Sequence, residues 1–386
     1  MARCETTNQS NEILAARSEF VPTALSGGVS ESAAPQVDWQ TAMRRAIRCS
    51  DELRRKLGLV ETSSANPTGQ SEPSTTAWNE SDACERPSGK DSFPTFVPLE
   101  YLARIRPGDP DDPLLRQVLA TPNEDVDVDG FSADPVGDRV SVAAAGLLHK
   151  YQGRALIITT GACGIHCRYC FRREFPYTLL GSRNRSWTPS LDYLGRHPEI
   201  DEVLLSGGDP LTLADPKLGE LVDAIEAIDH VRRLRFHTRM PIVIPQRVTP
   251  WLIERLSTSR LAVWMVVHAN HPNELDHHVL ATIGKLIDAG IPVLNQAVLL
   301  RGVNDDAQVL ADLCLKLVDH RIQPYYLHQL DRVRGAAHFE VPMETGMQLM
   351  EQLRGMLPGY ALPSYVVEQA GADSKTPLVD QNKSGQ

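Results

Sequence analysis

From residue 155 onward, short apolar runs alternate with stretches of amphipathic helical pattern. The runs typical of buried strands lie at residues 155–160, 202–206, 233–237, 262–268, 292–300 and 323–328. Helical patterns separate them, for example at 215–228, 250–259, 279–289 and 305–319. Because strands that alternate with helices pair in parallel, this rhythm predicts an α/β fold built from six parallel βα units.

The predicted strands end in clusters of polar residues. The first strand leads into a cysteine-rich loop, the second ends in Ser206-Gly-Gly-Asp209, and the fourth ends at His268. Polar residues at the carboxyl ends of successive parallel strands are typical of a barrel, whereas an open doubly wound sheet gathers them at one switch point. We therefore expect a partial (β/α)6 TIM-like barrel over residues 151–331, with an open side that needs covering.

Three cysteines, Cys163, Cys167 and Cys170, follow the first predicted strand with the spacing C-x3-C-x2-C. Thiolates hold iron–sulfur clusters, and three thiolates leave one iron of a four-iron cluster open. An open iron can bind S-adenosylmethionine, and an electron from the cluster can then split the sulfonium to a deoxyadenosyl radical. The alternatives are uncommitted thiols and a zinc site, although zinc usually takes four ligands in two pairs and the chain has no second C-x2-C pair.

The segments outside the predicted barrel differ from it in composition. Residues 1–95 are mostly polar, so we expect a mostly disordered N-terminal extension with a short helix near 39–57. Residues 96–150 mix helical pattern with Pro- and Asp-rich turns, which predicts an N-terminal helical cap. Residues 332–386 form a C-terminal segment.

Charge and hydropathy narrow the function classes. The net charge of −10 and the sequence pI near 5.7 argue against a broad nucleic-acid surface. The sequence has neither a run of 18 apolar residues nor the pattern of a secretory signal. We expect a cytoplasmic protein that acts on no nucleic acid and in no membrane.

Lys375 stands in a turn-rich loop, Gly371-Ala-Asp-Ser-Lys-Thr-Pro377, behind a short apolar run. A lone lysine in a loop is usually solvated surface. A loop lysine that faces a barrel mouth is also what a pyridoxal phosphate Schiff base requires. The pattern by itself leaves both interpretations open.

Other charged residues are predicted to lie near the barrel mouth. Asp331 and Glu368 could accept hydrogen bonds from an ammonium group, although exposed acidic residues are common. Arg172 follows the third cysteine and can bind a carboxylate with two parallel hydrogen bonds. Lys150 and Arg154 precede the first predicted strand and offer cations for a phosphate.

Two further sets of residues are weak signals when taken alone. The paired glycines Gly207 and Gly208 let backbone approach a ligand closely, and Asp209 can accept from an ammonium, but such a loop is more often only a turn. His268 closes the fourth strand and should point into the mouth, where it could meet a ribose hydroxyl; a core histidine is the alternative. The position one strand after the cysteine loop favours the functional interpretation of the glycines.

Together these residues resemble the lysine 2,3-aminomutase family of radical enzymes, which also use pyridoxal phosphate. The resemblance runs from about 97 to 379 and includes GLLHKYxxR, C-x3-C-x2-C-F-R-R, SGGDPL, HANHPNE, NQxVLLRGVND and PYYLHQLD. HQLDRVRGAAHF and the ending AGADSKTPLVD resemble the short branch of the family. That branch works in β-lysylation of translation elongation factor P.

The resemblance implies a role for each candidate residue. It implies three ligands of a [4Fe-4S] cluster: Cys163, Cys167 and Cys170. It implies four contacts to S-adenosylmethionine: Gly207, Gly208, Asp209 and His268. It implies a coenzyme Schiff base at one lysine and two cations near the coenzyme phosphate: Lys375, Lys150 and Arg154. It implies one contact to the substrate α-carboxylate and two to its ε-ammonium: Arg172, Asp331 and Glu368.

The implied reaction converts L-α-lysine to β-lysine, with an electron donor such as flavodoxin or ferredoxin and, in the short branch, an elongation factor P ligase as partners. Glu368 stands where the free-lysine mutases carry aspartate, so the anchor for the ammonium is one methylene longer. The first alternative is a free-standing lysine 2,3-aminomutase that makes β-lysine as a metabolite. An alternative of another class is a non-enzymatic iron–sulfur electron carrier or structural metal module.

Overall fold

The computed structural model describes residues 37–59, 93–177 and 186–378. Most of the N-terminal extension for which we expect disorder lies outside these residues. Where one helix was expected near 39–57, the structure has two short helices, α1 (Trp39–Arg45) and α2 (Ser50–Lys56). Arg45 ends α1, and an isolated bridge between Ile47 and Val97 ties the turn between the helices to the cap.

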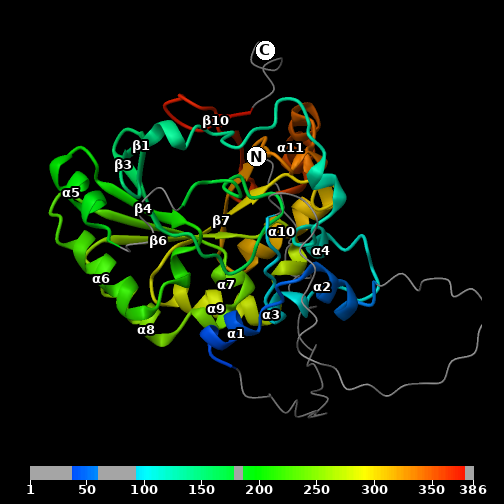
Figure 1. The fold of residues 1–386 in the computed structure, drawn as a ribbon, viewed down its shortest axis with the longest axis horizontal. Helices are drawn as coiled ribbons and strands as arrows, with labels where there is room; N and C mark the ends of the chain where they lie inside the picture. Colours follow the sequence, from blue (N-terminus) through cyan, green and yellow to red (C-terminus); the bar gives the residue numbers. More distant parts are fainter. Residues whose placement is uncertain (1–36, 60–92, 178–185, 379–386) are drawn as a thin grey trace, which may run out of the picture. The chain divides into compact units, whose positions relative to one another are not determined.

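One ten-stranded sheet runs through the described chain in sequence order (Figure 1). Its strands are β1 (Val142–Ala144), β2 (Leu147–Tyr151), β3 (Arg154–Thr160), β4 (Glu202–Gly207), β5 (Arg233–Thr238), β6 (Ala262–His268), β7 (Val293–Val298), β8 (Gln323–His328), β9 (Ser364–Val367) and β10 (Thr376–Pro377). Strands β3 to β9 are parallel, while β1, β2 and β10 pair antiparallel at the two edges.

The six predicted parallel strands correspond to β3 through β8, which confirms the partial-barrel class. A seventh parallel strand, β9, pairs with β8 and extends the sheet into the segment after residue 331. Its four residues, SYVV, form a run too short to give a strand–helix rhythm of its own.

Helices cover the outer face of the parallel strands (Figure 1). They are α5 (Thr188–Arg196), α6 (Asp215–Glu226), α7 (Met240–Val243), α8 (Pro250–Ser257), α9 (His277–Asp288), α10 (Ala307–Asp319) and α11 (Met343–Met356). In α9 the buried residues Val279, Ile283 and Leu286 recur at helical spacing and form one apolar face. None of the described helices is long and apolar enough to span a bilayer.

The alternating side chains of β4 show how the sheet presents residues to an internal cavity. Its side chains alternate, so that Val203 and Leu205 are fully buried, whereas Leu204 and Ser206 line an internal cavity. Successive side chains of a strand point to opposite faces of the sheet. One face therefore packs against the helices and the other lines the interior of the barrel.

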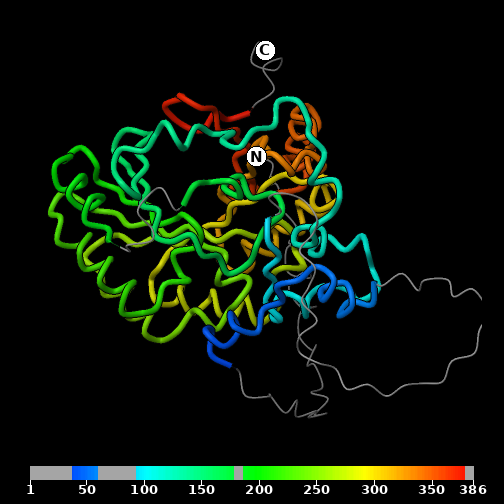
Figure 2. Tube along the Cα trace, viewed as in Figure 1, coloured from blue at the N-terminus to red at the C-terminus, as the bar shows by residue number. Residues whose placement is uncertain are grey.

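The cap segment closes over this interior. It contains α3 (Leu99–Leu102), α4 (Pro113–Arg116), η1 (Pro122–Asp125) and η2 (Arg139–Ser141). Ser132 forms a parallel bridge with Val333, and a Cβ on Gly137 would lie 3.1 Å from Ala370. The teal cap trace accordingly runs beside the red C-terminal trace (Figure 2).

Candidate active site

One internal cavity of about 330 Å³ gathers every site residue that the sequence pointed to. They are Lys150, Arg154, Cys163, Cys167, Cys170, Arg172, Gly207, Gly208, Asp209, His268, Asp331, Glu368 and Lys375. The sequence left Lys375 open between surface and site, and the structure places it on the cavity wall.

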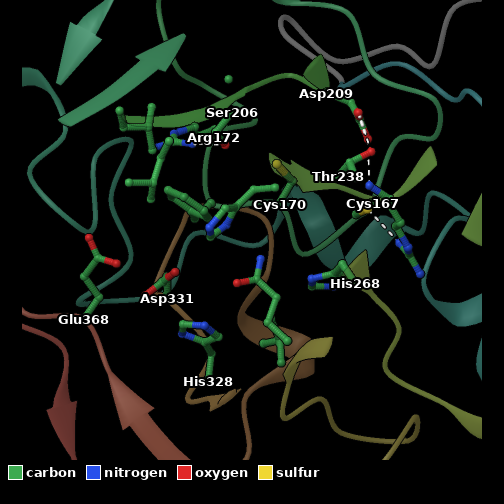
Figure 3. Close-up of a pocket in the computed structure, with 18 of the residues that line it drawn as sticks. Cys167, Cys170, Arg172, Ser206, Asp209, Thr238, His268, His328, Asp331 and Glu368 are labelled. Carbon is green, nitrogen blue, oxygen red and sulfur yellow. Dashed lines mark hydrogen bonds between the residues drawn. The ribbon is translucent and has the colours of Figure 1, made fainter. Parts of the chain in front are cut away.

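In the close-up view the cavity has two ends (Figure 3). Cys167, Cys170 and His268 lie toward one end, and Asp331 and Glu368 lie toward the other.

Buried ion pairs with the cap hold the cysteine loop. Glu124, in η1, accepts hydrogen bonds from Arg168 Nε at 2.7 Å, from Arg168 Nη2 at 2.5 Å and from Arg173 Nη2 at 2.6 Å. Arg168 is 1% exposed, and its guanidinium also lies over the ring of Phe93. Because Arg168 lies between Cys167 and Cys170 and Arg173 follows Cys170 closely, Glu124 fixes the loop from which the thiols project.

The three cysteines of the loop are partly buried. Burial raises the pKa of Cys163 well above its usual range and raises the pKa of Cys170 to about 11, and the neighbouring thiols contribute to both shifts. Metal binding replaces thiol protons, so a bound cation would stabilise the thiolates of Cys163 and Cys170. Three sulfurs on one loop in one cavity therefore fit the cluster that the motif predicts.

Arg239 is a site residue to which the sequence assigned no role. Its Nη1 donates a hydrogen bond to Cys167 Sγ at 2.7 Å, and its Nη2 donates to Gln117 Oε1 at 2.6 Å and Glu274 Oε2 at 2.7 Å. Gln117 and Glu274 are fully buried. The guanidinium is thus held against the Cys167 sulfur, where a hydrogen bond and a positive charge would tune the potential of a metal bound there.

The glycine loop after β4 packs directly on the cysteine loop. Gly207 adopts φ +111°, and a Cβ on Gly208 would lie 2.1 Å from the carbonyl oxygen of Ala162. The amide of Gly208 donates to Thr160 O at 2.7 Å, and the amide of Asp209 donates to Ala162 O at 2.7 Å. Only glycine allows this approach of two backbones.

Asp209 supports the loop rather than offering a free carboxylate. Its oxygens accept hydrogen bonds from Thr238 Oγ1 at 2.7 Å and from the amides of Arg239, Leu211 and Met240 at 2.7, 3.0 and 3.2 Å. The expected contact between this carboxylate and the amino group of S-adenosylmethionine stays a prediction. The structure adds a second task, which is joining the ends of β4 and β5.

His268 ends β6 and faces the cavity near the cysteines. Its Nε2 shares a hydrogen bond with the hydroxyl of Tyr169 at 2.9 Å, and the two rings stack with centroids 5.7 Å apart. Burial, together with the Arg239 charge, lowers the pKa of His268 to about 3. The imidazole is therefore neutral at physiological pH and suited to a hydroxyl partner.

At the other end, charged groups alternate in sign. Lys375 Nζ donates to Glu368 Oε2 at 2.5 Å, and Lys150 Nζ donates to Glu368 Oε1 at 2.8 Å. Lys150 Nζ also lies 2.7 Å from Asp138 Oδ1, and Arg172 Nε donates to Asp138 Oδ2 at 2.7 Å. Sequence reasoning missed Asp138, because no motif links it to its partners Lys150 and Arg172, which lie 12 and 34 positions further along the chain.

Asp331 is half-buried beside this network. Burial and the nearby Glu368 charge raise the pKa of Asp331 to about 7. For Glu368 the effect of burial is outweighed by Lys375 and Lys150, which lower its pKa to about 2. One of the two carboxyls is thus ionised throughout the physiological range, and the other titrates near neutrality.

Cationic and aromatic side chains that could bind a coenzyme line the same cavity. Arg154 stacks over the Tyr151 ring at 4.6 Å, and Arg235 also lines the cavity. Within the described residues, Arg235 Nε and His237 Nε2 are buried without a hydrogen-bond partner. Unsatisfied buried polar atoms in a cavity indicate room for a polar ligand. With Lys375 nearby, this wall fits a phosphorylated aldehyde coenzyme.

The fold and the cysteine loop define a radical SAM protein. Residues 157–314 match the model of the Radical SAM superfamily. Among solved structures, Streptococcus suis SuiB bound to S-adenosylmethionine gives a TM-score of 0.43 at 13% identity, covering 57% of this chain and 51% of that chain.

Curated relatives narrow the family. The chain is 44% identical to the L-lysine 2,3-aminomutase of Escherichia coli K12, over 88% of this chain and 94% of that protein. It is 45% identical to the L-lysine 2,3-aminomutase of Haemophilus influenzae, over 74% of this chain and 84% of that protein. The chain belongs to the lysine 2,3-aminomutase family.

Proposed function

We propose that the chain is a radical S-adenosylmethionine and pyridoxal phosphate dependent L-lysine 2,3-aminomutase, an isomerase that converts L-α-lysine to β-lysine. The observation that carries the proposal is the convergence of three cysteines and Lys375, more than two hundred residues apart, on one cavity. The family membership supports the same reaction. The alternative of an electron carrier or structural metal module gives no reason for a lysine and two carboxylates in the cavity.

The residues divide into three groups by the cofactor that each would hold. Cys163, Cys167 and Cys170 would hold a [4Fe-4S] cluster. Gly207, Gly208 and His268 would hold S-adenosylmethionine beside it. Lys375 and Arg154 would hold pyridoxal phosphate, whereas Lys150 is already paired with two carboxylates. Together these cofactors supply a carbon radical for hydrogen abstraction and an electron sink for the migrating amine.

The chain's own task is to bind and aim the substrate. Arg172 would bind the α-carboxylate, and Glu368 with Asp331 would bind the ε-ammonium, so that lysine is gripped at both ends. Asp331 would lose its proton as the ammonium binds, because an adjacent positive charge lowers the pKa of a carboxyl group. A substrate fixed at two points presents one β-hydrogen to the radical, and this positioning is the main protein contribution.

We further propose that the β-lysine serves β-lysylation of elongation factor P, delivered through a ligase, with reduction by a flavodoxin or ferredoxin. The support is the likeness of HQLDRVRGAAHF and AGADSKTPLVD to the short branch. This role also implies a cytoplasmic location. A free-standing enzyme that makes β-lysine as a metabolite remains the competing function.

Anaerobic reconstitution with iron, sulfide, coenzyme and S-adenosylmethionine tests the activity. Lysine labelled with ¹³C should yield β-lysine by mass spectrometry, and absence of both β-lysine and deoxyadenosine would contradict the enzyme. Supplying elongation factor P and its ligase then tests the role. Modified factor is expected at lysine concentrations where free β-lysine hardly accumulates.

A further inference from the structure

The two proposed ends of the lysine site are joined by a continuous path of charged side chains. Arg172 Nε lies 2.7 Å from Asp138 Oδ2, Asp138 Oδ1 lies 2.7 Å from Lys150 Nζ, and Lys150 Nζ lies 2.8 Å from Glu368 Oε1. The signs alternate at every step. Resting on the proposed function, we propose that Asp138 and Lys150 form a spacer that sets the distance between the carboxylate and ammonium anchors and thereby selects substrate length.

The spacer is held by its own surroundings. Asp138 is 1% exposed, and its amide donates to Asp134 Oδ1 at 2.8 Å. Lys150, on β2, makes a third contact by donating to the Val136 carbonyl at 2.9 Å. Gly137 turns the chain with φ +66°. The turn is fixed by a side-chain acceptor, and Lys150 is held by two hydrogen bonds and by its ion pair with Asp138 Oδ1. The path therefore has little freedom to stretch.

The anchors are each oriented by the spacer. Asp138 Oδ2 accepts a hydrogen bond from Arg172 Nε, and Ser206 Oγ accepts one from Arg172 Nη1 at 3.2 Å. These two bonds fix the plane of the guanidinium. Lys150 donates a hydrogen bond to Glu368 Oε1, and Lys375 donates one to Glu368 Oε2. When Lys375 binds the coenzyme, Oε2 becomes available to a substrate ammonium while Oε1 keeps its partner. Glu368 therefore receives the substrate without losing its position.

A fixed distance discriminates between diamino acids that differ only in length. Ornithine is one methylene shorter than lysine, so it cannot reach both anchors when the spacer holds them apart. A single methylene in a shaped pocket changes specificity by about 10- to 200-fold. Loss of the spacer lets Glu368 and Arg172 move, and the preference for lysine over ornithine should fall by at least about tenfold.

The test compares Asp138→Asn, Lys150→Met and the double variant with wild type, using the full chain loaded with its cofactors. The ratio of kcat/KM for lysine to that for ornithine should fall in each single variant, chiefly through a higher KM for lysine. Because both residues act in one path, the double variant should lose no more selectivity than a single variant. The double variant removes one negative and one positive charge, so its net charge is that of wild type, which also guards against misfolding. Lys285→Met, on the exposed face of α9, is the matched control.

A second readout needs no turnover. Thermal stabilisation of the coenzyme-loaded, iron-free chain by lysine and by ornithine should differ in wild type and converge in the variants. Equal losses for both amino acids, with unchanged ratios, would overturn the spacer and leave a purely structural role. Loss of bound coenzyme with unchanged selectivity would overturn it in favour of a phosphate role for Lys150. A wild-type protein that binds lysine selectively but makes no β-lysine would contradict the proposed function. The ratio of lysine binding to ornithine binding in the variants would still test the spacer.

Discussion

Lys375 lies directly opposite Glu368 in the β9–β10 hairpin, with 2.5 Å between Nζ and Oε2. The antiparallel register pairs Thr376 with Val367, so the residues one step outward must face each other. The pairing holds the amine on the cavity wall. To bind an aldehyde coenzyme, Lys375 must therefore leave this ion pair with Glu368.

The first prediction concerns that amine. Lys375→Ala should abolish the visible absorbance of bound coenzyme and all lysine turnover, because no other lysine of the described chain lines the cavity except Lys150, which two carboxylates hold. The iron content should stay at the wild-type level. Lys285→Ala should change none of the three measurements. A Lys375→Ala enzyme that still makes β-lysine would exclude this residue as the coenzyme anchor.

The second prediction concerns the thiols. Alanine at Cys163, Cys167 or Cys170 should remove most of the iron and the cluster's electron paramagnetic resonance signal after anaerobic reconstitution, since each is expected to bind one iron. Cys314 is a buried free thiol in α10. Cys314→Ala should keep full iron content and lower the free energy of unfolding by about 1 kcal/mol. Equal iron loss in all four variants would argue against a specific three-cysteine site.

The third prediction is a pH dependence. The pKa of Asp331 is raised to about 7, and its carboxyl binds an ammonium only when ionised. The lysine dissociation constant of coenzyme-loaded protein should fall as pH rises from 5.5 to 7.5, by up to about tenfold per unit. Asp331→Asn should bind more weakly and without this slope, whereas the surface variant Asp312→Asn should behave like wild type.

The same shift has a consequence for stability. The folded-state pKa of Asp331 lies above its ordinary value of 3.8, so ionisation costs the folded state free energy as pH rises between about 4 and 7. Asp331→Asn should therefore gain stability relative to wild type across that window. Chemical denaturation at pH 4.5 and pH 7.5 measures this gain, and a constant difference would show that the carboxyl titrates normally.

The fourth prediction concerns the clamp on the cysteine loop. Glu124→Gln leaves Arg168 and Arg173, whose side chains are 1% and 7% exposed, without their carboxylate. Breaking a buried pair by removing one partner costs about 3–5 kcal/mol, and cluster content should fall with it. Glu340→Gln removes the partner of the exposed Arg332 and should cost less than about 1 kcal/mol. Similar losses of stability and of cluster content in both variants would show that Glu124 does not stabilise the cysteine loop specifically.

Much of the architecture was predictable because it depends on local pattern. The apolar runs located β3 to β8, and the polar residues that followed them had to meet at one edge of a parallel sheet. This geometry brings His268, Asp331 and the cysteines to one cavity without any knowledge of loop conformations. The short strand β9 was not predicted, because four residues carry too little periodicity to distinguish a strand from a loop.

The supporting residues were not predictable in the same way. Asp138, Gln117 and Glu274 are single polar residues whose importance comes from burial against partners far away in sequence. Arg239 directly follows β5, but its hydrogen bond to Cys167 depends on how two loops pack. Lys150 was expected near a phosphate, and only the folded cap shows that Asp138 competes for its ammonium.

The clamp between Glu124 and its two arginines passes through protein side chains alone. We therefore expect the loop that carries the thiols to reach its final shape before iron is delivered. Cluster insertion would then be a late maturation step on a finished scaffold. An enzyme stripped of its metal by oxygen would be repairable by reloading, with no need for new synthesis.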